Sequence, residues 1–447
     1  MPRELTPDQA VALLQPDDRI GLPLGPGQPP QFLAALGERD DWAGLTISGA
    51  LLIAPSEAYT HPGVRIVSGF FGPLERWLAS DGHNVEFMPA DFRRFGPLAE
   101  AVSPRILATV AAPPDADGWC SLSLHAGGTL DELRRAGADP DRLLVVETSP
   151  HFPRTHGLPP GYDAGEIAHA AGWRPDHRHA LHLDEIDILI PGDAAPLALP
   201  ETEPSQTDRA IAEHAARFIA DGATLQTGIG SIPTAIASLL AETPGGGYGI
   251  HSEMLTDGIR RLHQAGKVTN DGKGILPGYS VTTFAFGSQE LYDWLANDEP
   301  PIAFLPVGVV NNPTLIGANR RMVTINGAMQ VDLTGQVVAE AIAGIQYSGA
   351  GGQEDFVSGP GTELEDRSLL CLPATRTTGD ETISRIVATL PAGSVVTTPR
   401  HQVDVIVTEF GAAELQGLTV RERGLALAEI AAPEFRDELR AAVSGLR

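Results

Sequence analysis

Residues 223–242, ATLQTGIGSIPTAIASLLAE, contain the clearest fold signal of the chain. Residues 223–227 are typical of a buried strand, and a turn with two glycines follows them. Beyond the turn the apolar residues recur on one helical face, which predicts a helix. We expect Ser231 to cap that helix and Pro233 to occupy its first turn. A strand, a glycine turn and a helix in this order are the repeating unit of an α/β fold.

The rest of the chain repeats this pattern. Apolar runs such as RILATVAA (105–112) and RLLVVET (142–148) alternate with helical segments in the first half. The runs PIAFLPVGVV (301–310) and SLLCLPA (368–374) predict strands in the second half, and their continuous apolar character is typical of parallel strands covered on both faces. The stretch DAAPLALPETEPSQTD (193–208) is rich in proline and acids and predicts a linker.

We therefore predict the α/β class, with two open α/β domains built on mainly parallel sheets with helices on both faces. The expected domains are residues 1–199 and residues 200–447. A chain of 447 residues is long enough for two such cores.

Composition excludes several classes of partner. The formal net charge is −26, from 31 Lys and Arg against 57 Asp and Glu, which argues against nucleic acid or an anionic membrane as the main partner. Two cysteines, Cys120 and Cys371, form no disulfide framework and no cysteine zinc site. The N-terminus shows no signal-peptide pattern, and no apolar stretch approaches a membrane span, so we expect a cytoplasmic protein.

The glycine turn is the first candidate site and comprises Gly228, Ile229, Gly230, Ser231 and Ile232. Such a turn lets the backbone approach a ligand closely and directs free N–H groups at an anion. The alternative is a tight turn without a ligand. The segment does not complete GxGxxG, and no GxxxxGK[ST] occurs in the chain, so dinucleotide and P-loop folds lose support.

The second candidate is Glu253, in GIHSE (249–253), at a predicted junction between a strand and a helix. A carboxylate with a reference pKa of about 4.3 is ionised near neutral pH and can act as a nucleophile without a separate base. The alternative is a surface or capping glutamate.

A third candidate is the glycine-rich segment SGAGGQEDF (348–356), which contains Gly351 and Gly352. Successive N–H groups in such a segment can form an anion nest or an oxyanion hole, whereas the alternative is a flexible loop. Upstream, Asn311 and Asn312 follow the predicted strand that ends in VGVV, although turn chemistry alone also explains an Asn-Pro pair.

A histidine cluster, His177, His179 and His182, superficially suggests a metal site. No carboxylate or cysteine at ligand spacing completes it, so we predict no metal there. The serine hydrolase elbow GxSxG is also absent from the chain.

The motifs GIGSIP, GIHSEMLTDG, NNP, INGAMQVDLTGQV and YSGAGGQEDF, in this order, resemble the acetyl-CoA hydrolase/transferase family, in particular its 4-hydroxybutyrate and butyrate/acetate CoA-transferases. The segments DADGWCSLSL (115–124) and VVETSPHFPRTHG (145–157) in the first half are similar to the same family. The resemblance therefore spans nearly the whole chain.

The resemblance implies a role for each matching residue. Glu253 matches the nucleophile, Gly352 the glycine whose amide contributes to the oxyanion hole, and Asn312 an amide side chain that assists it. The segment from Gly228 to Ile232, Gly351 and Arg376 match positions that bind coenzyme A.

The implied activity is transfer of CoA between small carboxylic acids, acetate and a short-chain or 4-hydroxy acyl-CoA, through a glutamyl-CoA thioester. CoA is then a substrate, no cofactor stays bound, and the partners are acyl-CoA and small carboxylates in a homodimer. Three alternatives stay open: an acyl-CoA hydrolase with the same glutamate, a binding protein that has lost the chemistry, and a sugar-phosphate isomerase, which no basic phosphate cluster supports.

Overall fold

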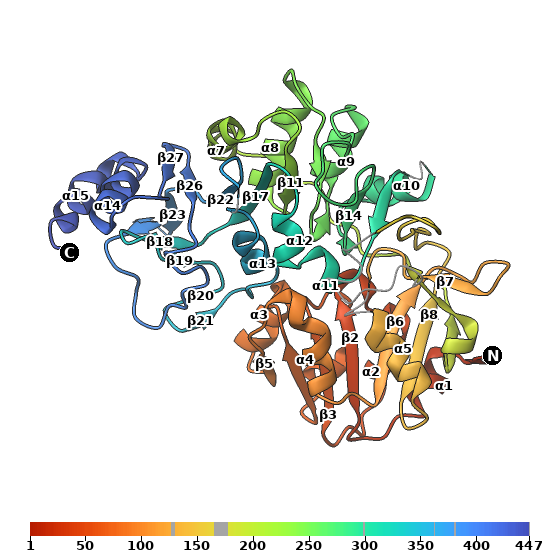
Figure 1. Ribbon diagram of the computed structural model, residues 1–447. Helices are drawn as coiled ribbons and strands as arrows, with labels where there is room; N and C mark the ends of the chain where they lie inside the picture. The colour runs from red at the N-terminus through yellow and green to blue at the C-terminus, as the bar shows by residue number, and fades with distance from the viewer. Residues whose placement is uncertain (127–129, 165–177, 298–299, 362, 380, 447) are drawn as a thin grey trace. The chain divides into compact units, whose positions relative to one another are not determined.

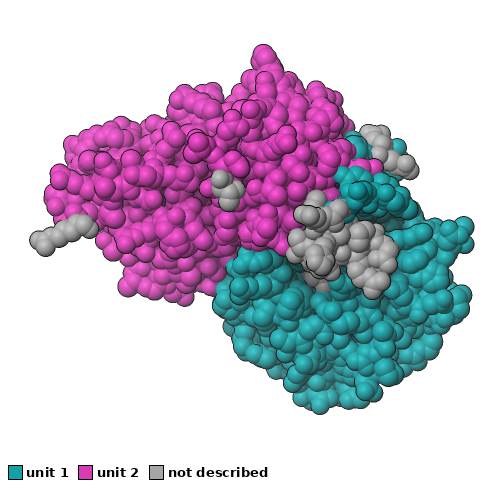
Figure 2. All heavy atoms as spheres, viewed as in Figure 1, with its two compact units in different colours: residues 1–199, 281–310 teal, residues 200–280, 311–447 magenta. Residues whose placement is uncertain are grey.

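The computed structural model describes residues 1–126, 130–164, 178–297, 300–361, 363–379 and 381–446. The chain forms two compact units, residues 1–199 with 281–310 and residues 200–280 with 311–447 (Figure 2). One boundary coincides with the expected end of the first domain at residue 199, whereas residues 281–310 pack with the first unit. The assignment of residues 1–199 and 200–447 as two domains stays a prediction.

The first unit is built on an eight-stranded sheet in which every pair of neighbours is parallel (Figure 1). In spatial order the strands are β1 (Arg3–Glu4), β10 (Ile188–Pro191), β8 (Leu143–Thr148), β6 (Ile106–Ala111), β2 (Arg19–Leu24), β3 (Leu45–Ala50), β4 (Val64–Ser68) and β5 (Val85–Phe87). The α-helices described within residues 1–199 are α1 (Pro7–Val11), α2 (Pro30–Gly37), α3 (Pro73–Ser80), α4 (Phe95–Ala101) and α5 (Leu130–Ala138).

This sheet is buried on both faces, as the apolar runs predict. Along β6, Ala108 belongs to one apolar cluster and Leu107 to another, because successive side chains of a strand point to opposite faces. Helix α2 contributes Phe32 to the first cluster, and α5 contributes Leu133 to the second. The central strands therefore need apolar residues at nearly every position.

Residues 281–310 join the first unit through backbone hydrogen bonds. Ala126 N donates to Thr283 O at 2.8 Å, and Phe304 N donates to His156 O at 2.9 Å. This segment contains β15 (Phe284–Ala285), α10 (Gln289–Asn297), β16 (Ile302–Phe304) and α11 (Val307–Val310), and β14 (Ser280–Thr282) leads into it. The strand predicted to end in VGVV is therefore wrong beyond Phe304, because the chain turns at Pro306 and residues 307–310 form a helical turn.

The second unit contains a six-stranded sheet that is parallel except at its last pair. Its strands, in spatial order, are β12 (Gly249–Ile250), β11 (Thr224–Thr227), β17 (Met322–Gly327), β22 (Arg367–Cys371), β26 (Val405–Thr408) and β27 (Gly411–Glu414). Its helices are α7 (Gln206–Ala215), α8 (Ser231–Glu242), α9 (Asp257–Gln264), α12 (Pro313–Gly317), α13 (Gln353–Ser358), α14 (Val420–Glu429) and α15 (Arg436–Val443).

Short strands complete this unit. They form a three-stranded sheet of β19 (Val337–Val338), β18 (Gln330–Asp332) and β25 (Ile386–Val387), and two hairpins, β20 (Ala341–Ile342) with β21 (Ile345–Gln346) and β23 (Thr375–Thr378) with β24 (Glu381–Ser384). Both units thus carry mainly parallel sheets with helices, and the predicted α/β class is confirmed.

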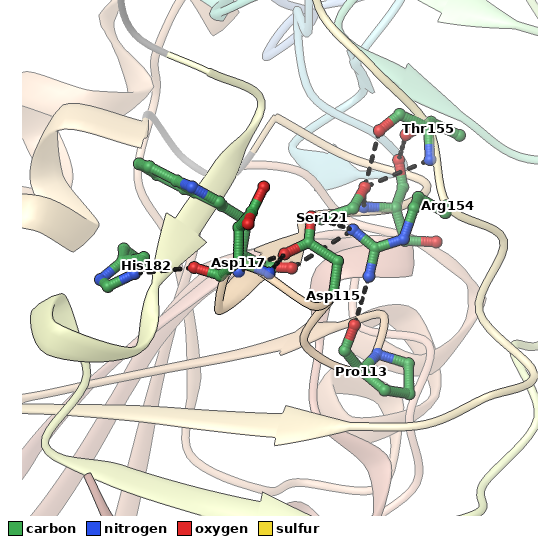
Figure 3. A network of polar contacts seen from close by, with 9 residues as sticks. Pro113, Asp115, Asp117, Ser121, Arg154, Thr155 and His182 are labelled. Atoms are coloured by element: carbon green, nitrogen blue, oxygen red, sulfur yellow. Dashed lines mark hydrogen bonds and ion pairs between the residues drawn. The ribbon is translucent and has the colours of Figure 1, made fainter. Parts of the chain in front are cut away.

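Two motifs of the first half meet in one polar network (Figure 3). Arg154 points into the loop of residues 113–119, where its guanidinium donates to Trp119 O at 3.2 Å and to Pro113 O, and lies 3.6 Å from Asp115 Oδ2. Ser121 Oγ donates to Thr155 O at 2.7 Å. Arg154 thereby joins three groups of one loop and fixes its shape.

Arg154→Ala should lower the free energy of unfolding by about 1–3 kcal/mol, because Pro113 O and Trp119 O lose the hydrogen bonds from the guanidinium. Differential scanning calorimetry measures the change. Arg65→Ala is the control in the same unit, since Arg65 pairs with Glu86 on the surface and should cost less than about 1 kcal/mol. An equal effect of both substitutions would contradict the assigned role of Arg154.

Candidate active site

The candidate residues of the second unit gather where two parallel strands end. Thr224 pairs with Gly249 and Leu225 with Ile250, so β11 and β12 finish at the same edge of the sheet. The glycine turn of residues 228–232 follows β11, and Glu253 comes three residues after β12. In parallel sheets the carboxyl ends of the strands are where ligands bind.

Ser252 fixes the loop that carries Glu253. Its Oγ lies 3.0 Å from Thr227 O and 2.9 Å from Met254 O, so its single hydrogen is shared between these two acceptors, and it accepts a hydrogen bond from Thr227 N at 3.3 Å. The residue before the glutamate is therefore tied to the end of β11, next to the glycine turn.

The glycine turn ends at α8, which begins at Ser231 with Gly230 as its N-cap. The prediction of Ser231 as the cap is wrong by one residue, because the cap has φ +124°, a conformation that only glycine adopts readily. A Cβ at Gly228 would meet no atom within 4 Å, and Ile229 is 49% exposed. The first turn of α8 thus presents backbone N–H groups in an open segment without acidic residues.

Glu253 is held by an amide. Asn311 Nδ2 donates to Glu253 Oε2 at 2.6 Å and to Asp355 Oδ2 at 3.1 Å. Asn311 and Asp355 are both fully buried. One side-chain amide thus joins two carboxyl groups, one from the loop after β12 and one from α13.

The surroundings change the acidity of the nucleophile candidate. Glu253 keeps partial exposure as a residue, but many protein atoms surround its carboxyl group, and this burial raises its pKa to about 8. The charge of Asp355 also raises the pKa, and the hydrogen bond from Asn311 lowers it. The expectation of a carboxylate ionised near neutral pH used the reference pKa of glutamate in water. Desolvation raises that pKa, so the group keeps its proton at neutral pH.

Gly352 leaves the space that the carboxyl group occupies. A Cβ at this position would overlap with Glu253 Oε2 and Asn311 Nδ2. Gly352 is also the N-cap of α13, and Gly351 before it has φ +55°. The structure thus brings Glu253 and Gly352 together, as the resemblance implies, with glycine required by close contact.

The predicted amide partner Asn312 lies elsewhere. Its Oδ1 accepts from Thr314 N at 3.0 Å as the N-cap of α12, and Asn311 is the residue that contacts Glu253. Sequence reasoning missed Asn311 although a signal was present. Asparagine directly before a proline that starts a helix is typical of a cap, which leaves the preceding amide for the site.

A second amide orients the histidine of the same loop. Asn319 Nδ2 lies 3.1 Å from Nδ1 of the fully buried His251, whose ring packs edge-on against Phe356. The same Nδ2 lies 3.3 Å from Leu315 O and from Ile316 O, so Asn319 connects His251 to the backbone of α12. Side-chain amides and a hydroxyl thus hold each residue of the loop from His251 to Glu253.

Arg376 lies exposed on the β23–β24 hairpin, and no described contact joins it to Glu253. Its neighbour Arg385 is partly buried. Burial, and then the charge of Arg376, lower the pKa of Arg385, while Glu409 acts in the opposite direction. Two guanidinium groups therefore lie close enough to repel each other, an arrangement that an anion would stabilise.

The remaining candidates have ordinary structural contacts. His179 Nε2 lies 3.1 Å from Ser123 O, and His182 Nε2 lies 3.1 Å from Asp117 O, whereas His177 lies outside the described residues. In the described part of the chain, no group of three His, Cys, Asp or Glu side chains is placed to hold a metal. Cys120 and Cys371 are buried, which raises the pKa of their thiols to about 11 and about 12.

Comparisons with known proteins place the chain in a family. Residues 287–443 match the acetyl-CoA hydrolase/transferase C-terminal domain. The 4-hydroxybutyrate coenzyme A transferase of Clostridium kluyveri is 34% identical over 97% of this chain and 96% of its own length. The chain belongs to the acetyl-CoA hydrolase/transferase family. The resemblance inferred from the motifs is thereby confirmed.

Two further proteins align with nearly the whole chain. The succinyl-CoA:cyclohexane-1-carboxylate CoA transferase of Geobacter metallireducens is 34% identical over 97% of this chain and 93% of its own. The crystal structure of RipA from Yersinia pestis superimposes with a TM-score of 0.85 at 31% identity, covering 99% of this chain and 97% of that one. Among the described residues, no helix combines the length and apolar composition needed to cross a bilayer.

Glu253→Gln should raise the melting temperature, and the gain should grow as the pH rises from 5 to 8. The folded protein holds the Glu253 proton up to about pH 8, while the group has its ordinary pKa of 4.5 in water. Between these values the folded state binds more protons than the unfolded state, so the wild type loses stability as pH rises. Melting curves at several pH values measure this, with the exposed Glu438→Gln as control. A pH-independent gain would contradict the raised pKa.

Gly352→Ala should destabilise the second unit by about 1–3 kcal/mol, because the added Cβ overlaps with the Glu253 carboxyl and the buried Asn311 amide and displaces both side chains. Gly327→Ala is the matched control, since a Cβ there meets no atom within 4 Å. Chemical denaturation compares the two variants. If Gly352→Ala were as stable as Gly327→Ala, the close approach of Glu253 to Gly352 would be wrong.

Proposed function

We propose that this protein is a CoA-transferase that moves CoA between small carboxylic acids, with Glu253 as its nucleophile. The observation that carries the proposal is the enclosed carboxyl group of Glu253, held by the Asn311 amide against Gly352 at the end of parallel strands. A glutamate that only capped a helix or faced solvent would need neither the buried amide nor the glycine.

The first half-reaction breaks the thioester. The Glu253 carboxylate attacks the carbonyl carbon of the acyl-CoA, and the C–S bond breaks to give a mixed anhydride and the CoA thiolate. The thiolate then attacks the glutamyl carbonyl carbon, forming a glutamyl-CoA thioester and expelling the first acid as a carboxylate.

The second half-reaction reverses these steps with another carboxylate. It attacks the glutamyl thioester, the thiolate leaves, and the thiolate then takes the acyl group from the new anhydride. Glu253 is regenerated as a carboxylate, and the new acid departs as acyl-CoA. The side-chain amide of Asn311 and the backbone N–H of Gly352 are the donors we assign to the oxygen on which negative charge develops.

The raised pKa of Glu253 fits this chemistry. Because a carboxylate that ionises near pH 8 is more basic than one in water, it is a stronger nucleophile once it has lost its proton. The same enclosure limits access of water to the anhydride and the thioester. Burial of the carboxyl group thus favours transfer to a carboxylate over hydrolysis by water.

We assign the binding of CoA to the glycine turn of residues 228–232, to Gly351 and to Arg376. The open first turn of α8 suits an anionic group, and Arg376 with Arg385 supplies local positive charge in a protein of net charge −26. CoA enters as a substrate, and the mechanism needs no permanently bound cofactor or metal.

The acids are inferred as a class. One relative is named for 4-hydroxybutyrate and another for cyclohexane-1-carboxylate, so proteins of similar sequence are named for different carboxylates. We infer acetate paired with a short-chain or 4-hydroxy acyl-CoA. The family description also includes hydrolases, and hydrolysis through the same glutamate is the second candidate.

Incubation with acyl-CoA and no acceptor should leave CoA on Glu253 as a thioester. Borohydride should reduce that thioester to an alcohol and inactivate the enzyme permanently, while borohydride alone should have no effect, because a carboxylate resists it. Peptide mass spectrometry should place the change on Glu253. Glu253→Ala and Glu253→Gln should reduce transfer by at least about 10³-fold, as the loss of a nucleophile does.

The same experiment separates the two candidate functions. A transferase should retain the thioester for minutes until a carboxylate is added, whereas a hydrolase would release free CoA continuously. Inactivation without acyl-CoA, or a label on Cys120 or Cys371, would overturn the glutamyl mechanism. Both thiols are buried and stay protonated, so a label there is not expected.

A further inference from the structure

The second unit contains a buried carboxyl group that the proposed mechanism leaves unused, that of Asp355. It lies on α13, three residues after Gly352, and is fully buried. Removing a carboxyl group from water is unfavourable unless hydrogen bonds offset the loss. Its position next to the nucleophile therefore calls for a functional explanation.

Resting on the proposed function, we propose that Asp355 is a positioning residue. It fixes the amide of Asn311 so that Nδ2 faces Glu253, and it places a negative charge close to the nucleophile. Its own atoms take part in no bond that forms or breaks.

The hydrogen bonds of Asn311 carry the first part of the proposal. An amide can rotate by half a turn and exchange its oxygen and nitrogen with little change in shape. Nδ2 has two hydrogens, and the two acceptors are Glu253 Oε2 at 2.6 Å and Asp355 Oδ2 at 3.1 Å. In the reversed orientation Oδ1 would face two carboxyl groups, so the pair of acceptors selects one orientation.

The other end of the amide supports this reasoning. Asn311 Oδ1 is buried and has no hydrogen-bond donor among the described residues. The orientation of the amide is therefore set at its nitrogen and not at its oxygen. Without Asp355, the amide would be oriented mainly by Glu253, the group that it has to hold in place.

The second part of the proposal concerns the charge of Asp355. Other titratable side chains also lie on the segments that flank Glu253. On the helices they are Glu242 (α8), Asp257, Arg260, Arg261 and His263 (α9) and Glu354 (α13), and in the loops they are His251 and Lys273. Asp257 pairs with Arg260 at 3.2 Å, and Lys273 Nζ donates to Ile250 O and Tyr279 O. The charge that raises the pKa of Glu253 is that of Asp355.

As a result, the Glu253 carboxyl group ionises at a higher pH than it does in water. Desolvation is the larger cause of the raised pKa of Glu253, and Asp355 adds to it. A neutral residue at position 355 lets Glu253 lose its proton at lower pH. Asn keeps an oxygen that can accept from Asn311, whereas Ala removes both the charge and the acceptor.

The test compares Asp355→Asn and Asp355→Ala with the wild type. In both variants the rising limb of kcat/KM for acyl-CoA should move to lower pH. At high pH, Asp355→Asn should keep kcat within about threefold of the wild type, and Asp355→Ala should lose at least about tenfold, because Asn311 is no longer oriented. Asp404→Asn is the control and should leave the pH profile unchanged, since Asp404 is a buried carboxyl before β26 that accepts from Ser368 N.

A second measurement does not depend on activity. The Glu253→Gln variant is more stable than the wild type by an amount that rises with pH. This difference levels off at the pKa of Glu253 in the folded protein. In an Asp355→Asn background that pKa is lower, so the gain should level off at a lower pH and be smaller at pH 8. Melting curves of the wild type, Glu253→Gln, Asp355→Asn and the double variant measure both the pH at which the gain levels off and its size at pH 8.

The outcomes separate the two proposals. Unchanged pH–rate profiles together with an unchanged gain at pH 8 would overturn the role of Asp355. If transfer survives Glu253→Ala, the proposed function fails instead, and the melting curves still decide whether Asp355 acts on Glu253.

Discussion

The site depends on the contact between the Asn311 amide and the Glu253 carboxyl group, which protein atoms largely surround. A carboxyl group enclosed by protein keeps its proton unless something favours the charge. The hydrogen bond from Asn311 favours the charged form, and burial and Asp355 favour the neutral form. The balance of these three effects sets how much of the nucleophile is available at a given pH.

The fold makes this balance possible through the parallel sheet. Because β11 and β12 end together, the glycine turn and the Glu253 loop leave the sheet side by side, and Ser252 ties one to the other. The strands beneath are buried, at every position of β11 and at all but the first of β22. Rigid packing beneath the loops lets a short polar segment keep one geometry.

The strand, turn and helix of residues 223–242 could be predicted because periodicity and glycine placement are local signals. Glu253 and Gly352 could also be singled out, although their contact is not visible in the sequence. Prediction fails at two local signals that were not weighed, a proline and a helix cap, and at one tertiary effect, burial. The turn at Pro306 converts an apolar run into a helix, the cap at Asn312 shifts the active amide to Asn311, and burial moves the pKa of Glu253 far from its value in water.

Gly352 also constrains how such sequences change over evolutionary time. Every other amino acid carries a Cβ, and at this position that atom would occupy the place of the Glu253 carboxyl oxygen. No single substitution at residue 352 is therefore compatible with the present position of Glu253. A related sequence that lacks this glycine has to place the carboxyl and amide groups differently, so position 352 serves as a marker of whether an uncharacterised homologue retains this arrangement.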